Sequence, residues 1–324
     1  MSRGKVTIAD VAERAGVNAS TVSRVVNGTA SLSPDTTARV QRAIAELGYR
    51  PNRAARHLAG GRTGAIGIVV PDLTNPFFAT IVRGAQHAAH DAGELTLVAD
   101  SESRGRGEVE LSAMLARDVD GLVLCSPTSP AGQLRGAVTG RPAVLVNRQA
   151  RGWPSVVADQ AQAVEVAFDD VRSQGHERIA YVRGPSNKWT SSVRDRVAAR
   201  LGAVLVGPFA PTFAGGAEAA EVLDDDVTAV ITHNDLMAVG LIDALLRKGR
   251  RVPRDLSVLG CDDIEIAALT RPRLTSVAMP LEELGATAVG LLLDLIARPA
   301  PDVDSLHRTL PVWLVARDST ARPK

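Results

Sequence analysis

Between residues 65 and 260 the sequence alternates short apolar runs with longer stretches of helical periodicity. Eight runs have the length of buried strands: AIGIVV, LTLVAD, GLVLC, AVLVN, IAYV, AVLVG, TAVIT and LSVLG. Amphipathic stretches such as residues 77–92 and 236–248 lie between them. Strands that alternate with helices predict parallel sheets with helices on both faces. The alternation breaks near residues 159–174, which indicates two similar halves rather than one large sheet.

The first fifty residues have a different pattern, that of three short helices. Thr7 and Asp10 have the spacing of a capping box at the start of the first helix. A second helix is expected over residues 18–27. Ser33, which is followed by a proline, predicts the start of the third helix, and Gly48 predicts its end.

Two short helices joined by a glycine-containing turn and backed by a third describe a helix-turn-helix unit, whose second helix enters the major groove of DNA. Arg24 can donate two hydrogen bonds to a guanine edge, Ser20 can bond to several bases, and the Ala19 methyl group can contact a thymine methyl. Short side chains suited to phosphate contacts are Ser23, Asn27 and Thr36. The alternative is a generic three-helix bundle whose polar face is only solvated.

The charge distribution separates the same two regions. The whole chain carries a formal charge of +1, which by itself indicates no charged partner. Residues 1–62 hold ten basic and four acidic residues, a balance of +6, and the remainder is therefore −5. A basic head on a mildly acidic body favours a nucleic-acid partner for the head alone.

Several other classes of protein are disfavoured by the sequence. Cys125 and Cys261 lie inside apolar runs and not at metal-ligand spacing, which fits a reduced compartment. The N-terminus lacks the apolar stretch of a signal peptide, and no apolar run approaches the length of a membrane span. We expect a soluble cytoplasmic protein with no metal or cofactor. An enzyme on a nucleotide-binding fold is the rival class, but no dinucleotide, P-loop or nucleophile-elbow motif is present.

Two segments of the head carry a resemblance to a known family. VTIADVAERAGVNASTVSRVVNG and LSPDTTARVQRAIAELGYRPNRAARHLAGG resemble the DNA-binding head and hinge of the lactose-repressor/galactose-repressor family of bacterial transcription regulators. The resemblance extends over residues 6–60. It implies that Ala19, Ser20 and Arg24 contact bases. It implies backbone contacts for Thr7, Ser23, Asn27 and Thr36.

The same resemblance implies a hinge helix over residues 51–60 that folds only on operator DNA. Leu58 would insert into the minor groove, with Asn52, Ala55 and Arg56 as its groove and phosphate neighbours. A ten-residue helix is marginal in water on its own, which agrees with folding on DNA. A plain polar linker over residues 51–62 is the alternative.

The body resembles the family's effector-binding domain, which is shared with periplasmic sugar-binding proteins. The resemblance implies an α/β domain of two doubly wound parallel-sheet lobes that closes on a small molecule. It places chain crossings between the lobes near Asp159, near residues 275–279 and near residues 310–314. The expected organisation is a helix-turn-helix domain over 1–50, a hinge over 51–62 and an effector and dimerisation domain over 63–324. Within the last, lobe 1 takes about 63–159 and 280–309, and lobe 2 takes about 160–279 and 310–324.

Open parallel sheets bind ligands at the carboxyl ends of their strands. The candidate effector contacts collected there are Asn75, Phe77, Phe78, Asp100, Arg148, Asp159, Trp189, Arg194, Asn234, Asp235 and Asp262. Carboxylates, an arginine and an aromatic ring suit a polyhydroxylated ligand, so a sugar or sugar derivative is expected and a purine or other metabolite is the alternative. The chain is shorter than the usual family pattern between Arg194 and Phe213, which leaves Trp189 less secure.

Structural roles compete with ligand contact at several of these positions. Asp235 is placed either to cap the following helix or to contact the ligand. Asn75 has a turn as its alternative role. One of Phe77 and Phe78 is expected in the core or at a dimer interface. His87 and His90 are expected on a solvated helix face rather than at a metal site.

The combined prediction is a transcription regulator that binds a pseudo-palindromic operator and changes its DNA affinity when an effector occupies the cleft. A repressor is expected, with an activator as the alternative. The absence of leucine heptads near the end of the sequence favours a homodimer over a tetramer. A free sugar-binding protein is a second rival, but it leaves residues 1–60 without a role.

Overall fold

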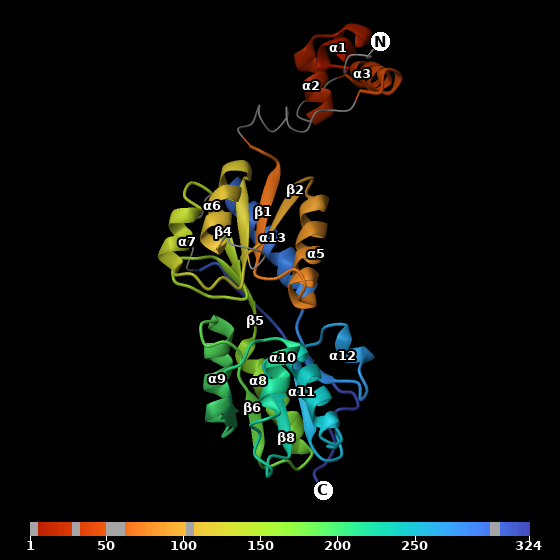
Figure 1. Ribbon diagram of the computed structural model, residues 1–324. Coiled ribbons are helices and arrows are strands. Elements are labelled where there is room, and N and C mark those ends of the chain that lie inside the picture. The colour runs from red at the N-terminus through yellow and green to blue at the C-terminus, as the bar shows by residue number, and fades with distance from the viewer. Residues whose placement is uncertain (1–5, 28–32, 50–61, 102–106, 299–304) are drawn as a thin grey trace. The chain divides into compact units, whose positions relative to one another are not determined.

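The computed structural model describes residues 6–27, 33–49, 62–101, 107–298 and 305–324. The chain divides into two compact units, Met1–Gly64 and Ala65–Lys324, which we call the head and the body. Figure 1 shows the helices and strands of each unit.

The head consists of three helices: α1 (Ile8–Ala15), α2 (Ala19–Asn27) and α3 (Pro34–Leu47). The predicted capping box is present, because Thr7 and Asp10 exchange side-chain-to-backbone hydrogen bonds at the start of α1. Helix α2 begins one residue later than predicted. Asn18 is its cap, and its side-chain oxygen accepts from the Thr21 amide at 2.8 Å.

The core of the head is small and lies between the three helices. Val11, Val22 and Val40 are fully buried there, one from each helix. Alanines fill the remaining space because short side chains let the helices approach closely. This packing uses one face of α2 and leaves the polar residues of that helix outside the core.

The body contains two six-stranded sheets (Figure 1). The first has the order β11-β5-β4-β3-β1-β2, made of β1 (Ala65–Val70), β2 (Leu95–Asp100), β3 (Gly121–Cys125), β4 (Ala143–Val146), β5 (Ser155–Ala158) and β11 (His307–Leu310). The second has the order β12-β10-β9-β8-β6-β7, made of β6 (Ile179–Val182), β7 (Val204–Val206), β8 (Ala229–Thr232), β9 (Ser257–Asp262), β10 (Thr275–Ala278) and β12 (Trp313–Val315). Among the described strands only the β10–β12 pair is antiparallel.

Helices cover both sheets, as the alternating pattern predicts. We call the first sheet and its helices lobe 1, whose helices are α5 (Pro76–Asp91), α6 (Glu108–Asp118), α7 (Ala131–Ala137) and α13 (Leu281–Ala297). We call the second sheet and its helices lobe 2, whose helices are α8 (Gln160–Ser173), α9 (Trp189–Arg200), α10 (Phe213–Ala219), α11 (Asp235–Arg247) and α12 (Ile266–Leu269). The predicted fold class is confirmed.

All eight predicted strands are present, and the described chain adds β5, β10, β11 and β12. The added strands are three or four residues long and lie beside the points where the chain passes between lobes. Strands β11 and β12 are the edges of their sheets, and their residues are half-buried or exposed. Strand β11 contains His307, Arg308 and Thr309, so it lacks the continuous apolar run that predicted the eight strands.

The chain passes between the lobes three times in the described body. It leaves lobe 1 after β5 at Asp159, which caps α8. It returns through Met279 and Pro280, between β10 and α13. It leaves lobe 1 again between β11 and β12, at residues 311–312. These crossings bring the carboxyl ends of the strands of both lobes to one region.

Each lobe contains one pair of helices in very close contact through glycines. In lobe 1, a Cβ atom added at Gly84 of α5 would overlap the carbonyl of Glu282, and one added at Gly285 of α13 would overlap the carbonyl of Ile81. In lobe 2, helices α10 and α11 pack equally closely. A Cβ atom added at Gly216 of α10 would overlap the carbonyl of Met237, and one added at Gly240 of α11 would overlap the carbonyl of Phe213. These positions require glycine because the facing backbone occupies the space of a side chain.

Replacing Gly285 with alanine tests this packing, and Gly290 on the same helix is its control. We expect Gly285→Ala to lower the free energy of unfolding by about 1–3 kcal/mol, because the new methyl group forces α5 and α13 apart. Gly290 has open space around it, so Gly290→Ala should raise the free energy of unfolding by up to about 1 kcal/mol through helix propensity. Urea unfolding of both variants measures the difference. Equal stability of the two variants would contradict close packing at Gly285.

Candidate functional site

The second helix of the head presents its polar residues to solvent. Ala19, Ser20 and Arg24 are exposed, and Ser23 is half-buried. The Ser20 hydroxyl donates to the Asn18 side chain at 2.7 Å, which fixes its orientation. This exposed row is the face that a helix-turn-helix unit places against base edges.

The other predicted DNA contacts of the head have capping roles or lie outside the described residues. The Thr7 hydroxyl donates to Asp10 at 2.8 Å. The Thr36 hydroxyl lies 2.8 Å from the Ser33 hydroxyl at the start of α3. Asn27 is the last residue of α2. The predicted hinge contacts outside the described residues are Asn52, Ala55, Arg56 and Leu58.

The body contains a cavity of about 390 Å³ at the carboxyl ends of the strands of both lobes. From lobe 1 its lining residues are Pro71, Asp72, Asn75, Phe77, Phe78, Ser126 and Asn147. From lobe 2 they are Pro185, Lys188, Thr190, Arg194, Ala210, Pro211, Thr212, His233, Asn234, Leu236 and Asp262. A cavity of this size accommodates a small organic molecule.

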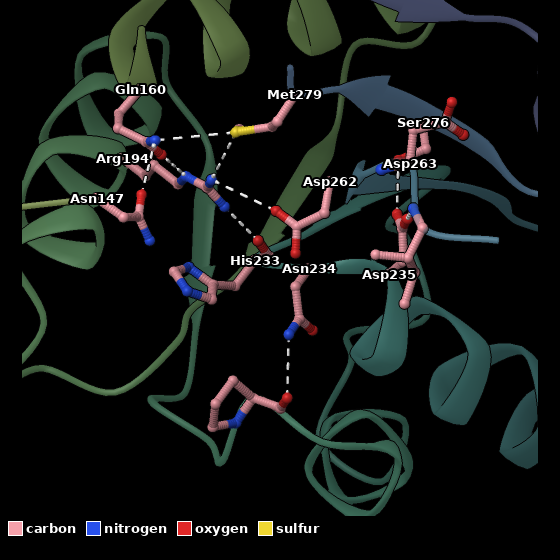
Figure 2. A network of polar contacts seen from close by, with 12 residues as sticks. Asn147, Gln160, Arg194, His233, Asn234, Asp235, Asp262, Asp263, Ser276 and Met279 are labelled. Carbon is pink, nitrogen blue, oxygen red and sulfur yellow. Dashed lines mark hydrogen bonds and ion pairs between the residues drawn. The ribbon is translucent and has the colours of Figure 1, made fainter. Parts of the chain in front are cut away.

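Arg194 is the central cation of this cavity and is only 4% exposed (Figure 2). Its Nε donates to Gln160 Oε1 at 2.6 Å, and its Nη1 donates to the carbonyl of His233. Its Nη2 lies 3.8 Å from a carboxylate oxygen of Asp262. A buried guanidinium needs such partners, because it cannot lose its proton at ordinary pH.

Asp262 ends strand β9 and is buried beside Arg194. Its backbone has a φ of 114°, a left-handed conformation that turns the chain sharply at the cavity wall. Burial raises the pKa of Asp262 to about 7, and the nearby charge of Arg194 opposes this rise.

Asn234 and Asp235 have separate roles at the start of α11. The Asn234 side chain accepts from the Met237 amide at 3.0 Å, so Asn234 is the cap and also lines the cavity. Asp235 is fully buried outside the lining, where it accepts from the Ser276 hydroxyl at 2.5 Å and the Ile264 amide at 2.8 Å. Asp235 therefore neither caps α11 nor lines the cavity, the two roles expected for it. It holds the loop after β9 instead.

Asn75, Phe77 and Phe78 form the lobe 1 wall of the cavity. Asn75 caps α5 by accepting from the Phe77 amide at 3.0 Å. The two phenylalanine rings pack edge to face with centroids 5.0 Å apart, and they are 5% and 9% exposed. Both rings therefore belong to the core of lobe 1 and to the cavity wall at once.

Four further predicted contacts lie outside the cavity lining. Asp100 accepts from the Leu73 amide at 2.9 Å and supports the loop after β1. Arg148 donates to two carbonyls of the loop after β3, at 2.8 and 2.7 Å. Asp159 caps α8. Trp189 is the half-buried first residue of α9, and the next residue, Thr190, lines the cavity instead.

His233 is a cavity residue that the sequence analysis did not select. Burial, followed by the charges of Arg194 and Lys188, lowers the pKa of His233 well below its usual value, so the imidazole is neutral. Its Nδ1 has no hydrogen-bond partner among the described residues. The ring packs against Gly184, where a Cβ atom would collide with it. Its place directly before Asn234 in the HND segment was the available signal.

Comparisons with known proteins agree with both units. The family model described as bacterial regulatory proteins, lacI family, matches residues 7–52, and a periplasmic binding protein-like domain matches residues 168–320. Catabolite control protein A of Priestia megaterium is 33% identical over an alignment of 336 positions, which covers 97% of this chain and 99% of that protein. This chain belongs to the lacI family of bacterial regulatory proteins. The predicted family is therefore confirmed, and the chain is a DNA-binding transcription regulator.

Solved structures of the lacI family match the whole chain or the body. The structure of the Lac repressor dimer bound to operator and the anti-inducer ONPF matches with a TM-score of 0.82 and 30% identity, over 98% of this chain and 99% of that chain. A LacI family regulator from Enterococcus faecalis with bound ribose matches with a TM-score of 0.74 and 28% identity, over 80% of this chain and all of that chain.

The described part of this lacI-family chain shows neither a candidate metal site nor a candidate membrane-spanning helix. No group of three or more His, Cys, Asp or Glu side chains is placed there to hold a metal ion. No helix in the described ranges has both the length and the apolar character needed to cross a bilayer. His87 and His90 are both exposed on α5, the position expected for a solvated face.

The raised pKa of Asp262 predicts a pH dependence of stability. Because the pKa in the folded protein is above its ordinary value of 3.8, folding takes up a proton between about pH 4 and pH 7. The free energy of unfolding should therefore fall as the pH rises through this window, by up to about 1.4 kcal/mol per pH unit. Asp262→Asn should show a flatter profile.

Urea unfolding at about pH 5 and about pH 8 compares the two proteins. Asp318→Asn, at an exposed carboxylate paired with Arg273, is the control and should keep the wild-type difference between the two pH values. Parallel profiles for wild type and Asp262→Asn would show that the Asp262 carboxyl is ionised throughout.

Proposed function

We propose that this lacI-family regulator is a cytoplasmic repressor without catalytic activity, which binds operator DNA as a homodimer and is controlled by a sugar or sugar derivative. The observation that carries the effector assignment is the cavity of the body. The cavity is lined by the guanidinium of Arg194 and the carboxyl group of Asp262 from lobe 2 and by Phe77 and Phe78 from lobe 1.

The chemistry of the cavity suits a polyhydroxylated ligand. The Asp262 carboxylate can accept from hydroxyl groups, the Asn234 amide can accept and donate, and the Lys188 ammonium can donate. An aromatic wall covers the apolar face of a sugar ring. The Enterococcus faecalis relative with bound ribose supports the same ligand class for this chain.

The head supports operator binding through charge and through the exposed face of α2. Its positive balance provides sequence-independent attraction to phosphates. Arg24, which is exposed on α2, can then select guanine through two parallel hydrogen bonds. The Lac repressor structure with operator supports this use of the head.

Strand β2 supports assembly as a homodimer. It is an edge of the lobe 1 sheet, and Leu95 and Leu97 on it are 58% and 41% exposed. Exposed leucines on a sheet edge are an aggregation risk unless another surface covers them. A second copy of the chain, placed as in a two-fold dimer, would cover the same strand on both subunits.

Control by the effector would act through a population shift. If the lobes can adopt two relative orientations, a ligand that binds one conformation more tightly than the other raises the population of the first. If the head has different DNA affinities in the two states, the ligand changes operator binding by its differential affinity.

Substitution of Arg24 tests the proposed base contact. Arg24→Lys keeps the positive charge but loses the planar pair of donors, so specific operator binding should weaken by on the order of 10-fold or more. Binding to unrelated DNA should change little. A gel-shift assay with a palindrome from upstream of the gene measures both affinities.

Arg14→Lys is the matched control for this experiment. Arg14 lies on α1 and is paired with Glu46 at 2.5 Å, and lysine can keep this ion pair. Its operator affinity should equal that of the wild type. If Arg24→Lys also binds the operator as the wild type does, Arg24 makes no bidentate contact with a base.

A thermal-shift screen with D-ribose, lactose, cellobiose and adenosine tests the effector class. At least one of the sugars should raise the melting temperature of the wild type. Asp262→Asn loses a charged acceptor, and Arg194→Lys keeps the charge but loses the planar set of donors. Each should weaken the binding of that sugar by on the order of 10- to 100-fold. Asp318→Asn should retain the full shift. A shift with adenosine and none with the sugars would contradict the proposed ligand class.

A further inference from the structure

Gln160 occupies a special position between the two lobes of the body. It is the first residue of α8 and follows Asp159, where the chain first passes from lobe 1 to lobe 2. Its side chain is polar but the residue is only 2% exposed. A buried amide at such a site is stable only when its donors and acceptor are used.

The amide of Gln160 connects one residue from each lobe (Figure 2). Its Nε2 donates to Asn147 Oδ1 at 3.3 Å, at the end of β4 in lobe 1. Its Oε1 accepts from Arg194 Nε at 2.6 Å, on α9 in lobe 2. Asn147 in turn donates to the Ser126 hydroxyl at 2.8 Å, so the connection continues to the end of β3.

The second crossing between the lobes meets the same groups. Met279 lies in that crossing, and its sulfur is 3.8 Å from both Gln160 Nε2 and Arg194 Nη2. Two of the three crossings are therefore in contact with the Arg194 guanidinium. A movement of one lobe against the other changes the Gln160–Asn147 contact directly.

Asn147 and Arg194 line the cavity, whereas Gln160 is outside the lining. A ligand in the cavity can thus reach the two partners of Gln160 without touching Gln160 itself. A ligand hydroxyl that bonds to Arg194 or Asn147 competes with Gln160 for these two side chains.

We infer that Gln160 is a latch that holds the two lobes in one relative orientation through its hydrogen bonds to Asn147 and Arg194, and that an effector bonding to Arg194 or Asn147 releases it. The release step rests on the proposed function, whereas the latch does not. Gln160 is in this account a positioning residue. Through Gln160, the hydrogen bonds of Arg194 influence the relative orientation of the lobes.

Single-molecule energy transfer between dyes on the two lobes tests the latch. Gln133→Cys on α7 and Glu218→Cys on α10 provide exposed attachment sites, and the native Cys125 and Cys261 are buried. The full chain is measured without sugar or DNA. The wild type should show one dominant inter-dye distance.

Two latch variants and one control are compared on this labelled background. Gln160→Met keeps a side chain of similar size and loses both hydrogen bonds. Gln160→Glu keeps the acceptor for Arg194 but loses the donor to Asn147. The control, Gln162→Met, makes the same glutamine-to-methionine substitution at an exposed position of α8. We expect both Gln160 variants to raise the population of other inter-lobe distances by on the order of 10-fold, and Gln162→Met to leave it unchanged.

The outcomes separate the latch from a purely structural role and from the proposed function. A structural role alone would lower the melting temperature of Gln160→Met while the distance distribution stays that of the wild type, and this result would overturn the latch. If Gln160→Met does not fold, Gln160→Glu decides by the same criterion. Failure of the sugars to bind would contradict the proposed function without affecting the distances measured here.

Discussion

The burial of one positive charge, that of Arg194, organises the body of this regulator. A guanidinium removed from water must be surrounded by acceptors, and a missing partner leaves a large free-energy cost. Arg194 has the carbonyl of His233, the side-chain oxygen of Gln160 and the carboxylate of Asp262 around it. These groups come from the ends of two strands and from the start of the helix after the first crossing. All of these groups belong to lobe 2, and the Gln160 side chain links them to lobe 1 by donating to Asn147 Oδ1 at 3.3 Å.

The two lobes supply rigid walls for this charge. Each is a mostly parallel sheet whose strands end at the cavity, and each contains one helix pair held closely together by glycines. Rigid lobes joined by short crossings concentrate movement at the crossings, where Gln160 and Met279 contact the guanidinium. Ligand binding and inter-lobe movement thus involve the same few groups. This arrangement gives a physical basis for coupling a small molecule to the arrangement of the two lobes.

The fold was predictable from local patterns, whereas the cavity was predictable only in part. Apolar runs predicted eight of the described strands, including the edge strands β2 and β7, and the caps at Thr7 and Ser33 placed two helices. Strand β11 was missed because it contains His307, Arg308 and Thr309 and therefore has no apolar run. At the cavity, Arg194, Asn234 and Asp262 line the wall, but Asp100, Arg148 and Asp159 support loops or a helix end instead. Sequence position places a residue at a strand end, but only tertiary packing decides whether its side chain enters the cavity, as His233 shows.

The separation of charge between the head and the body gives the regulator two kinds of partner, DNA phosphates and a small molecule. The central claim is that the two binding events are linked, and linkage is reciprocal. The most direct test is calorimetric titration of a sugar that stabilises the protein, with and without saturating operator DNA. The account predicts that operator changes the sugar affinity by the same factor by which the sugar changes the operator affinity. An identical sugar affinity with and without operator would contradict it.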